Sequence, residues 1–161
     1  MFSLKGKTAV ITGGGSGIGR GIAKVFAAQG ADVKILELNQ DAGLAVCKEI
    51  IEAGGSASVH GCDVSKQADV VSLFNSIGKV DILVNAAGMN LREPFTAVSP
   101  KSWQEQLNVH LGAPFFLTQA LAPQMKDREW GRIINIASLQ SFRAFANSAP
   151  YGAGKGGIVQ L

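Results

Sequence analysis

The segment Thr12–Gly19 constrains the fold of this chain more than any other part of it. It reads Thr-Gly-Gly-Gly-Ser-Gly-Ile-Gly. It follows the apolar run Thr8–Ile11, which is typical of a strand, and precedes Arg20–Ala28, which has the apolar spacing of a helix. The first N–H groups of a helix have no internal partners, and glycines let the main chain approach a phosphate closely. A strand, a glycine loop and a helix in this order predict a dinucleotide-binding site.

Strand-like segments recur along the rest of the chain and alternate with helix-like segments. Apolar, β-branched runs predict strands at Lys7–Thr12, Ala31–Glu37, Ser56–Val59, Val80–Val84 and Arg132–Ala137. This alternation predicts an α/β fold, namely a doubly wound parallel sheet of Rossmann type with helices on both faces. In that architecture ligands bind at the carboxyl ends of the strands.

The expected helices begin at recognisable caps. Gly30 is expected to end the first helix, and Asn39, Ser65 and Ser99 are the expected N-caps of the next three. The helix after Ser99 is expected to be long, with a kink at Pro114. The predicted ranges after these N-caps are 40–53, 67–76 and 100–125, and a further helix begins near residue 151.

The last expected helix contains the final residue, Leu161, and its apolar side chains have no expected partner surface. We therefore expect residues 1–161 to form one dinucleotide-binding Rossmann domain whose C-terminal strands are missing. The hydrophobic fraction of 47% is that of a globular chain.

Composition also excludes several classes of protein. The net charge of +3 is scattered and forms no basic stripe, so no nucleic-acid partner is expected. No apolar run could span a membrane, and the N-terminus does not resemble a secretion signal. Cys47 and Cys62 have neither metal-site nor disulfide spacing. These features predict a cytoplasmic protein without a membrane partner or a metal site.

Acidic residues end two of the expected strands. Glu37 stands twenty residues after Gly17, where a carboxylate can accept hydrogen bonds from both ribose hydroxyls and repel a 2′-phosphate. Neither Ser16 nor Leu38 supplies a positive charge, so the pattern favours NAD over NADP. Asp63, which precedes Val64, could meet an adenine amino group. The alternatives are a solvated strand-end carboxylate for Glu37 and a turn residue for Asp63.

The pair Tyr151 and Lys155 is the sharpest chemical signal. Residues four apart share a helix face, and a lysine ammonium beside a phenol favours the phenolate. Such a phenol can exchange a proton during the interconversion of an alcohol and a carbonyl. Ser138 follows the last apolar strand and could hydrogen-bond a substrate oxygen, unless it is only a turn serine. Asn108, within a helix, could hold a water or a carbonyl, or face solvent.

Together these residues resemble the short-chain dehydrogenase/reductase family over nearly the whole chain. Five motifs follow the family pattern in order: Thr12–Gly19, Asn85-Ala86-Ala87-Gly88, Asn108 in its helix, Ser138 thirteen residues before the tyrosine, and Tyr151-x-x-x-Lys155. The resemblance implies a doubly wound fold that continues past residue 161 with further strands and a substrate-covering loop. From the sequence itself we expect His60 and His110 to be structural rather than catalytic.

The resemblance assigns roles to these positions. Tyr151 would be the general acid and base, and Lys155 would favour its phenolate and hold the nicotinamide ribose. Ser138 would orient the substrate oxygen, and Asn108 would fix a water in the proton relay. The expected cofactor-binding set is Gly13, Ser16, Gly17, Ile18, Gly19, Glu37, Asp63, Val64, Asn85, Ala87, Tyr151 and Lys155.

The implied function is transfer of a hydride between NAD and a secondary alcohol or ketone, such as a polyol or sugar acid. The loop Gln140–Pro150 would form part of the substrate wall. Three alternatives remain: a 3-oxoacyl-thioester reductase, which the NAD preference disfavours, a catalytically silent nucleotide-binding fragment, and a methyltransferase on a similar sheet. A full-length protein of this family would form a homodimer or homotetramer.

Overall fold

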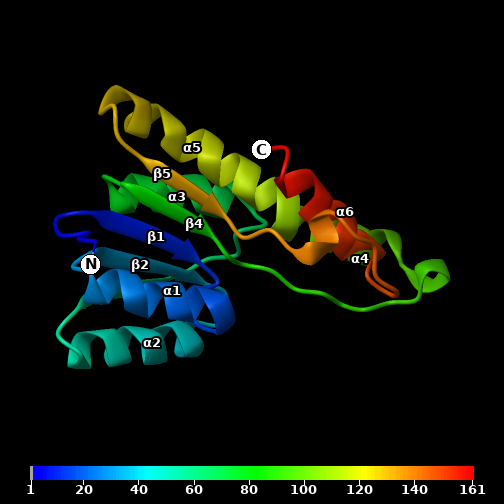
Figure 1. Cartoon of the computed structure of the whole chain (residues 1–161), viewed down its shortest axis with the longest axis horizontal. Helices are drawn as coiled ribbons and strands as arrows, with labels where there is room; N and C mark the ends of the chain where they lie inside the picture. Colours follow the sequence, from blue (N-terminus) through cyan, green and yellow to red (C-terminus); the bar gives the residue numbers. More distant parts are fainter. Residues whose placement is uncertain (1) are drawn as a thin grey trace.

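The computed structural model describes residues 2–161, apart from the side chains at positions 67, 68, 71, 72 and 75. In this part of the chain, a five-stranded parallel sheet has the order β3-β2-β1-β4-β5 (Figure 1). The order reverses between β1 and β4, as expected of a doubly wound sheet. The strands are β1 (Thr8–Thr12), β2 (Asp32–Glu37), β3 (Ser56–Gly61), β4 (Ile82–Asn85) and β5 (Arg132–Asn135).

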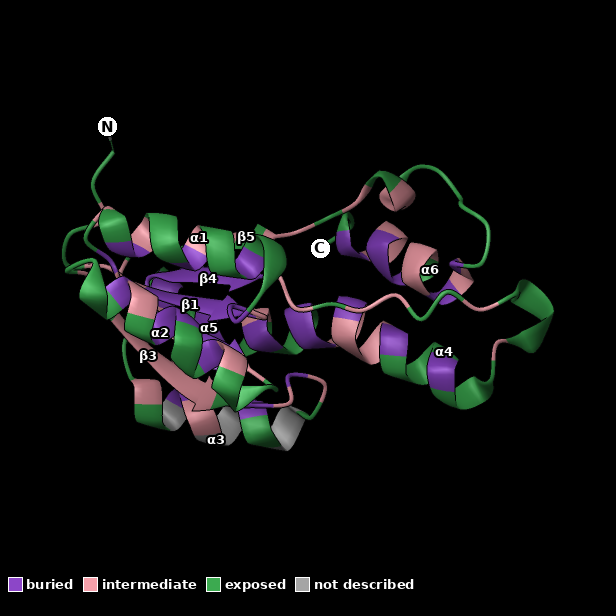
Figure 2. Ribbon diagram, turned by 90° about the horizontal axis from the view of Figure 1, so that it is seen from below, coloured by how far each residue is buried: buried purple, intermediate pink, exposed green. Residues whose placement is uncertain are grey.

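Helices cover both faces of the sheet and also form an arm beyond it. One face carries α1 (Gly17–Ala28) and α2 (Gln40–Glu52), and the other carries α3 (Gln67–Ile77) and α5 (Ala113–Asp127). The arm consists of α4 (Pro100–Leu107) and α6 (Ala149–Ile158), which lie side by side past the carboxyl ends of the strands (Figures 1 and 2). Short helical turns lie at η1 (Phe95–Ala97), η2 (Asn108–Gly112) and η3 (Leu139–Ser141).

The core follows from the two-residue period of the strands. Ala9 and Ile11 of β1 point to α1 and α2, whereas Val10 between them points to α3 and α5. All three are fully buried, and Figure 2 shows β1 and β4 enclosed between the helices. Strands buried on both faces read as continuous apolar runs, which is why these segments were predictable from the sequence.

Two of the three predicted N-caps are confirmed. Asn39 accepts a hydrogen bond from the Ala42 N–H, and Ser99 accepts one from the Ser102 N–H, with Pro100 at the first helical position. The prediction for Ser65 is wrong, because Lys66 occupies the N-cap of α3. The Ser65 hydroxyl instead donates to the Asp63 carboxylate at 2.7 Å. The Ser65 side chain therefore stabilises the turn and does not cap the helix.

The predicted long helix from Pro100 is present and runs without a break to Asp127, but it is not α-helical throughout. It contains η2, a π-helical turn in which the Asn108 carbonyl accepts the Ala113 N–H. Pro114 has no N–H, and its ring would clash with the carbonyl four residues earlier in a regular helix. The wider turn accommodates the proline without ending the helix, and Pro123 lies within α5 without ending it.

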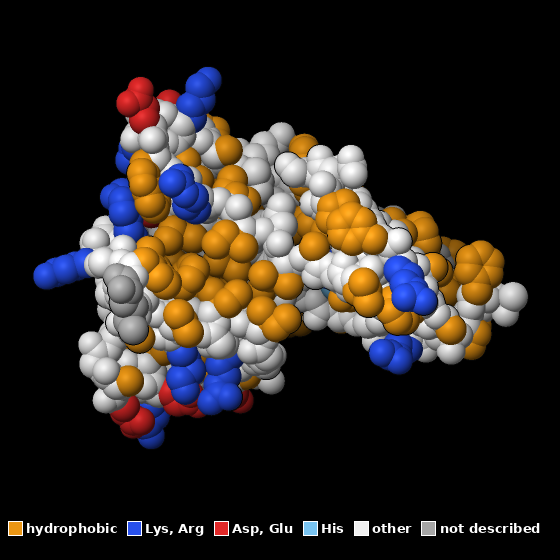
Figure 3. Space-filling model, in the orientation of Figure 1, with side chains coloured by type: hydrophobic (Ala, Val, Ile, Leu, Met, Phe, Trp, Pro, Cys, Tyr) orange, Lys and Arg blue, Asp and Glu red, His pale blue; other side chains and the backbone are white. Residues whose placement is uncertain are grey.

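Strand β5 is much less buried than β1 and β4. It is the last strand in the order, and the Ile134 side chain is 39% exposed. Figure 3 shows hydrophobic side chains gathered in the middle of the molecule and again along the arm. The segments next to the arm expose several large side chains to solvent. Among them are Phe95 in η1 and Phe142 at the end of η3, which are 80% and 81% exposed.

Candidate active site

A cleft of about 520 Å³ lies at the carboxyl ends of β1, β2 and β4, and its volume is in the range of small-molecule sites. Most of the residues predicted to bind the cofactor line it: Gly13, Ser16, Gly17, Ile18, Gly19, Glu37, Asp63, Val64 and Ala87. No binding role was predicted for the other lining residues, which are Leu36, Leu38, Cys62, Ala86, Gly88, Met89 and Val109. Most of these lie at or just beyond strand ends, and that position alone could have identified them.

The glycine loop lets the main chain pack where side chains would not fit. Gly13 has φ of +65°, and a Cβ there would lie 2.8 Å from the Ala87 Cα. A Cβ on Gly19 would collide with the Gly13 carbonyl oxygen. Ser16 occupies the N-cap of α1 without accepting a hydrogen bond, and no acidic residue lies in the first turn. The start of α1 is therefore suited to an anionic group, and this geometry fits a dinucleotide pyrophosphate.

We expect Gly19→Ala to destabilise the protein by about 1–3 kcal/mol and to weaken dinucleotide binding about tenfold or more, because the added methyl group forces the loop apart. Gly21→Ala is the matched control, since Gly21 is exposed in the same helix with nothing within 4 Å of an added Cβ. It should stabilise the helix by about 0.5–1 kcal/mol. Urea unfolding and a dinucleotide titration measure both effects. Equal responses of the two variants would contradict the assigned packing.

Thr12 connects the glycine loop to the segment after β4. Its hydroxyl oxygen accepts the Ala86 and Ala87 N–H groups at 3.0 and 2.9 Å. Asn85 lies beneath this segment, buried, and its amide donates to the Asn135 side-chain oxygen at 2.8 Å. The structure therefore does not bring Asn85 into the cleft but places it where it joins β4 to β5. Ala87, two residues on, does line the cleft.

Both predicted acidic residues face the cleft and are held by main-chain donors. The Glu37 carboxylate accepts the Gly15 N–H at 3.0 Å and the Asn39 N–H at 3.2 Å. Asp63 accepts the Ser65 hydroxyl and N–H, and these bonds hold the pKa of the Asp63 carboxyl below its usual value. Asp63 is thus a turn residue that also lines the cleft, so the two interpretations of it are compatible.

Tyr151 and Lys155 share one side of α6. Lys155 is buried, its ammonium donates to the Ile136 carbonyl, and it lies 5.9 Å from the centre of the Tyr151 ring. Burial lowers the pKa of Lys155. The Tyr151 ring packs edge to face against His110, with ring centroids 4.8 Å apart. His110 in turn contacts Met89, which lines the cleft, so a short path of contacts joins the phenol to the cofactor side.

The other two predicted catalytic residues, Ser138 and Asn108, each accept one hydrogen bond from a neighbour. The Ser138 hydroxyl oxygen accepts the Gln140 N–H at 3.1 Å, which leaves its O–H free to donate. The Asn108 side-chain oxygen accepts from Gln104 at 2.7 Å, and its neighbour Val109 lines the cleft. Ser138, Tyr151 and Lys155 do not line the cleft themselves. Tyr151 and Lys155 belong to α6 of the arm, and Ser138 lies at the start of η3.

Further features limit the chemistry of the described residues. Among residues 2–161, no group of three or more His, Cys, Asp or Glu side chains is arranged to hold a metal ion. Nor does any helix in this part of the chain have the length and apolarity to cross a membrane. Burial, with Asp69 and Asp63 nearby, raises the pKa of the Cys62 thiol to about 11, so this cleft residue is an inert lining group at neutral pH.

The family model for short chain dehydrogenases matches residues 7–161. The chain belongs to the short-chain dehydrogenase family. The methyltransferase alternative is thereby excluded. The family match also agrees with the fold, because the doubly wound sheet superimposes on solved short-chain dehydrogenase structures.

Three relatives illustrate the similarity of this short-chain dehydrogenase chain. It is 41% identical to D-beta-hydroxybutyrate dehydrogenase of Cupriavidus necator over 97% of this chain and 62% of the relative. A metagenomic short-chain oxidoreductase solved with NADP is 36% identical, with a TM-score of 0.94 over 99% of this chain and 75% of the other. A gluconate 5-dehydrogenase from Burkholderia cenocepacia, solved with NADP and tartrate, is 37% identical, with a TM-score of 0.89 over 99% and 64%. The chain therefore spans less than two thirds of the length of the curated relative.

Proposed function

We propose that this chain binds NAD in the cleft and that the protein transfers a hydride between NAD and a secondary alcohol or ketone, in particular a polyol or sugar acid. The observation that supports it most is the cleft itself, in which a fixed carboxylate, Glu37, faces the uncapped start of α1. A bound nicotinamide supplies the hydride acceptor or donor. The names of the relatives, which include a hydroxy-acid and a sugar-acid dehydrogenase, agree with this substrate class.

Glu37 supports the choice of NAD over NADP. Its carboxylate is held at the edge of the cleft by two main-chain N–H groups, where it can accept the ribose hydroxyls and would repel a 2′-phosphate. Arg20 is the nearby cation, but its guanidinium donates to both carboxylate oxygens of Glu49 at 2.9 and 2.8 Å. The NADP in two solved relatives is a property of those proteins. In this chain the fixed negative charge of Glu37 supports the proposed preference for NAD.

Glu37→Gln is expected to reduce the discrimination between NAD and NADP by about tenfold or more, because glutamine keeps an acceptor oxygen but loses the charge. Glu52→Gln is the control, since it removes the charge of an exposed carboxylate at the far end of α2, which pairs with Lys48 outside the cleft. The two dissociation constants, measured for each variant at the same ionic strength, give the result. A ratio that Glu37→Gln leaves unchanged would remove Glu37 from cofactor selection.

The contacts of α6 support the predicted catalytic roles. Tyr151 would exchange a proton with the substrate oxygen, and the Lys155 ammonium, fixed on the Ile136 carbonyl, lies 5.9 Å from the centre of the Tyr151 ring. Ser138 would donate its free O–H to the same substrate oxygen. Asn108, with its side-chain oxygen engaged by Gln104, would hold a water through its amide nitrogen.

The substrate class is tested by NAD-linked turnover over a panel of polyols, sugar acids, hydroxy acids and 3-oxoacyl thioesters. Highest turnover on a polyol or sugar acid supports the proposal. Preference for a thioester with NADPH would support the reductase alternative, and dinucleotide binding without turnover on any of them would support a silent fragment. The exposed Phe142, Arg143 and Phe145 would contribute to the substrate wall, and exposed aromatic residues on α5 would contribute to a homodimer or homotetramer interface.

A further inference from the structure

His110 is a buried titratable side chain to which the proposed chemistry gives no role. It is 1% exposed and lies in the π-helical turn between α4 and α5. Its ring meets the Tyr151 ring at an interplanar angle of 82°, in a T-shaped contact. Such edge-to-face contacts stabilise one relative orientation of two rings. The neighbour of the proposed acid and base is therefore a group that can itself change charge.

Two glycines make room for this ring and fix its position. A Cβ on Gly88, in the segment after β4, would lie 2.6 Å from the His110 Cε1. A Cβ on Gly154, on α6, would lie 2.7 Å from the His110 Cβ. The imidazole is thus clamped between the cleft segment and the helix that carries Tyr151. Movement of the ring would disturb both.

The hydrogen bonds of His110 favour its neutral form. Nε2 lies against both the Met89 carbonyl oxygen and the Met89 N–H, whereas Nδ1 is buried and has no hydrogen-bond partner among the described residues. The charged imidazolium carries a proton on both nitrogens, and the proton on Nδ1 would have no acceptor. Burial lowers the pKa of His110, the Met89 carbonyl opposes this, and the Lys155 charge lowers it further.

We propose that His110 is a positioning residue for Tyr151. The neutral imidazole holds the Tyr151 ring in its orientation on α6 and connects it to the Met89 segment of the cleft. The inference rests on the proposed function only for the role of Tyr151 as acid and base. Protonation of His110 would put an unpaired charge between these elements, and Tyr151 would lose its fixed orientation.

The groups that face His110 are few. From α6 they are Tyr151 and the positively charged Lys155. The segment after β4 contributes Gly88 and the Met89 main chain, which do not titrate. Among these groups of the described residues, His110 is the one expected to change charge in mildly acidic solution, and the variants below test whether Tyr151 responds to it.

The chain has one tyrosine and two histidines, which makes a direct test possible. Protein carrying ring-labelled ¹³C-tyrosine gives NMR signals from Tyr151 alone and can be titrated from about pH 7.5 to about pH 5. We expect these signals to move with one midpoint below the ordinary histidine value of 6.5. His60→Gln, which removes the other imidazole, should keep the response, and His110→Phe should abolish it.

A second readout separates positioning from general stability. His110→Ala should lower kcat about tenfold with the KM for the dinucleotide within about twofold, and His110→Phe, which restores a ring, should recover most of kcat. Tyr151 signals that stay fixed over the titration, or that move equally in His110→Phe, would overturn the proposal. The NMR titration needs no turnover, so its result remains valid even if the proposed activity is not found. If the His110 variants do not fold, the native protein and His60→Gln still decide it.

Discussion

Replacing Tyr151 by phenylalanine is expected to lower NAD-linked turnover by about 10²–10⁴-fold and to leave dinucleotide affinity within about twofold. The phenol oxygen is the proposed proton donor and acceptor, and phenylalanine lacks it. The ring itself remains, so its edge-to-face contact with His110 is kept and the fold should not change. The loss should therefore appear in kcat and not in binding.

The control is a change to another aromatic residue, one that lies outside the cleft. Phe95 is 80% exposed and lies in η1, apart from the cleft and from the Tyr151 contacts. Phe95→Leu should leave turnover unchanged. Turnover is best measured at saturating dinucleotide on the most active substrate of the panel. A Tyr151→Phe variant as fast as the native protein would refute the proposed acid and base.

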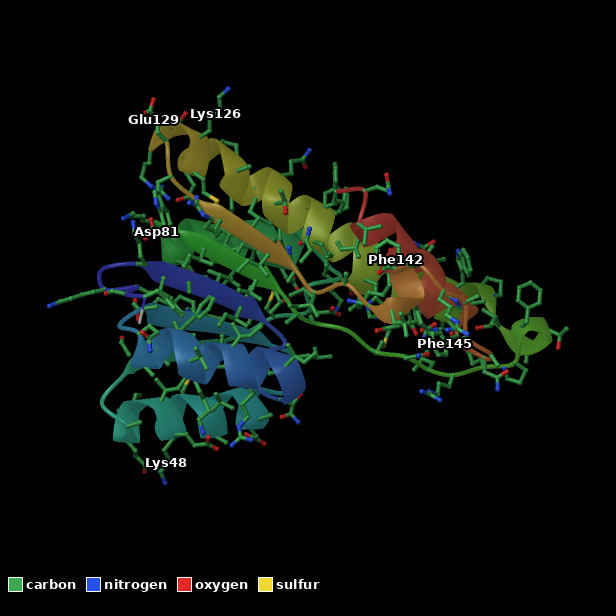
Figure 4. The ribbon with its side chains drawn as sticks, in the orientation of Figure 1. Lys48, Asp81, Lys126, Glu129, Phe142 and Phe145 are labelled. Carbon is green, nitrogen blue, oxygen red and sulfur yellow. The ribbon has the colours of Figure 1, made fainter. Side chains whose placement is uncertain are left out.

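The second large effect is expected at Asp81, which lies at the opposite end of the sheet from Phe142 and Phe145 (Figure 4). It is 2% exposed, and its carboxylate accepts the Thr8 N–H at 3.0 Å. The same carboxylate lies 3.3 Å from the Lys79 ammonium and 3.7 Å from the Arg128 guanidinium. It thus joins the starts of β1 and β4 to the end of α5.

We expect Asp81→Ala to lower the free energy of unfolding by about 1–3 kcal/mol, because it leaves the Thr8 N–H and the partly buried Arg128 guanidinium without their acceptor. Asp127→Ala, at an exposed site in the last turn of α5, should change it by less than about 0.5 kcal/mol. Urea unfolding of the two variants provides the measurement. A loss at Asp81 no larger than that at Asp127 would show that this network adds little to stability.

The sheet was predictable because its signals are local. The apolar runs around Val10 and Leu83 are buried on both faces of the parallel sheet, as their continuous hydrophobic character predicts. The π turn in the long helix was not predictable, because Pro114 requires only that the regular hydrogen bonding be relieved and does not say how. Likewise Ser65 has the character of a cap, and only the nearby Asp63 carboxylate draws it away from that position.

The two parts of the candidate site differ in how much the sequence reveals. The cofactor side depends on loop glycines and strand-end acids whose spacing is fixed by short turns, so Gly13, Gly19 and Glu37 could be assigned from the sequence. The contact between His110 and Tyr151 joins residues 41 positions apart. It also depends on the π turn, which shifts the phase of the helix by one residue. A count at 3.6 residues per turn therefore could not place His110 beside the phenol.

The exposed side of β5 has a consequence for the rest of the sheet. The strand stands at one end of the strand order, and its Ile134 side chain is 39% exposed. A strand in that position can hydrogen-bond one more neighbour, as the family resemblance implies with its further strands. We therefore expect the next strand to pair with β5 and to bury the Ile134 side chain.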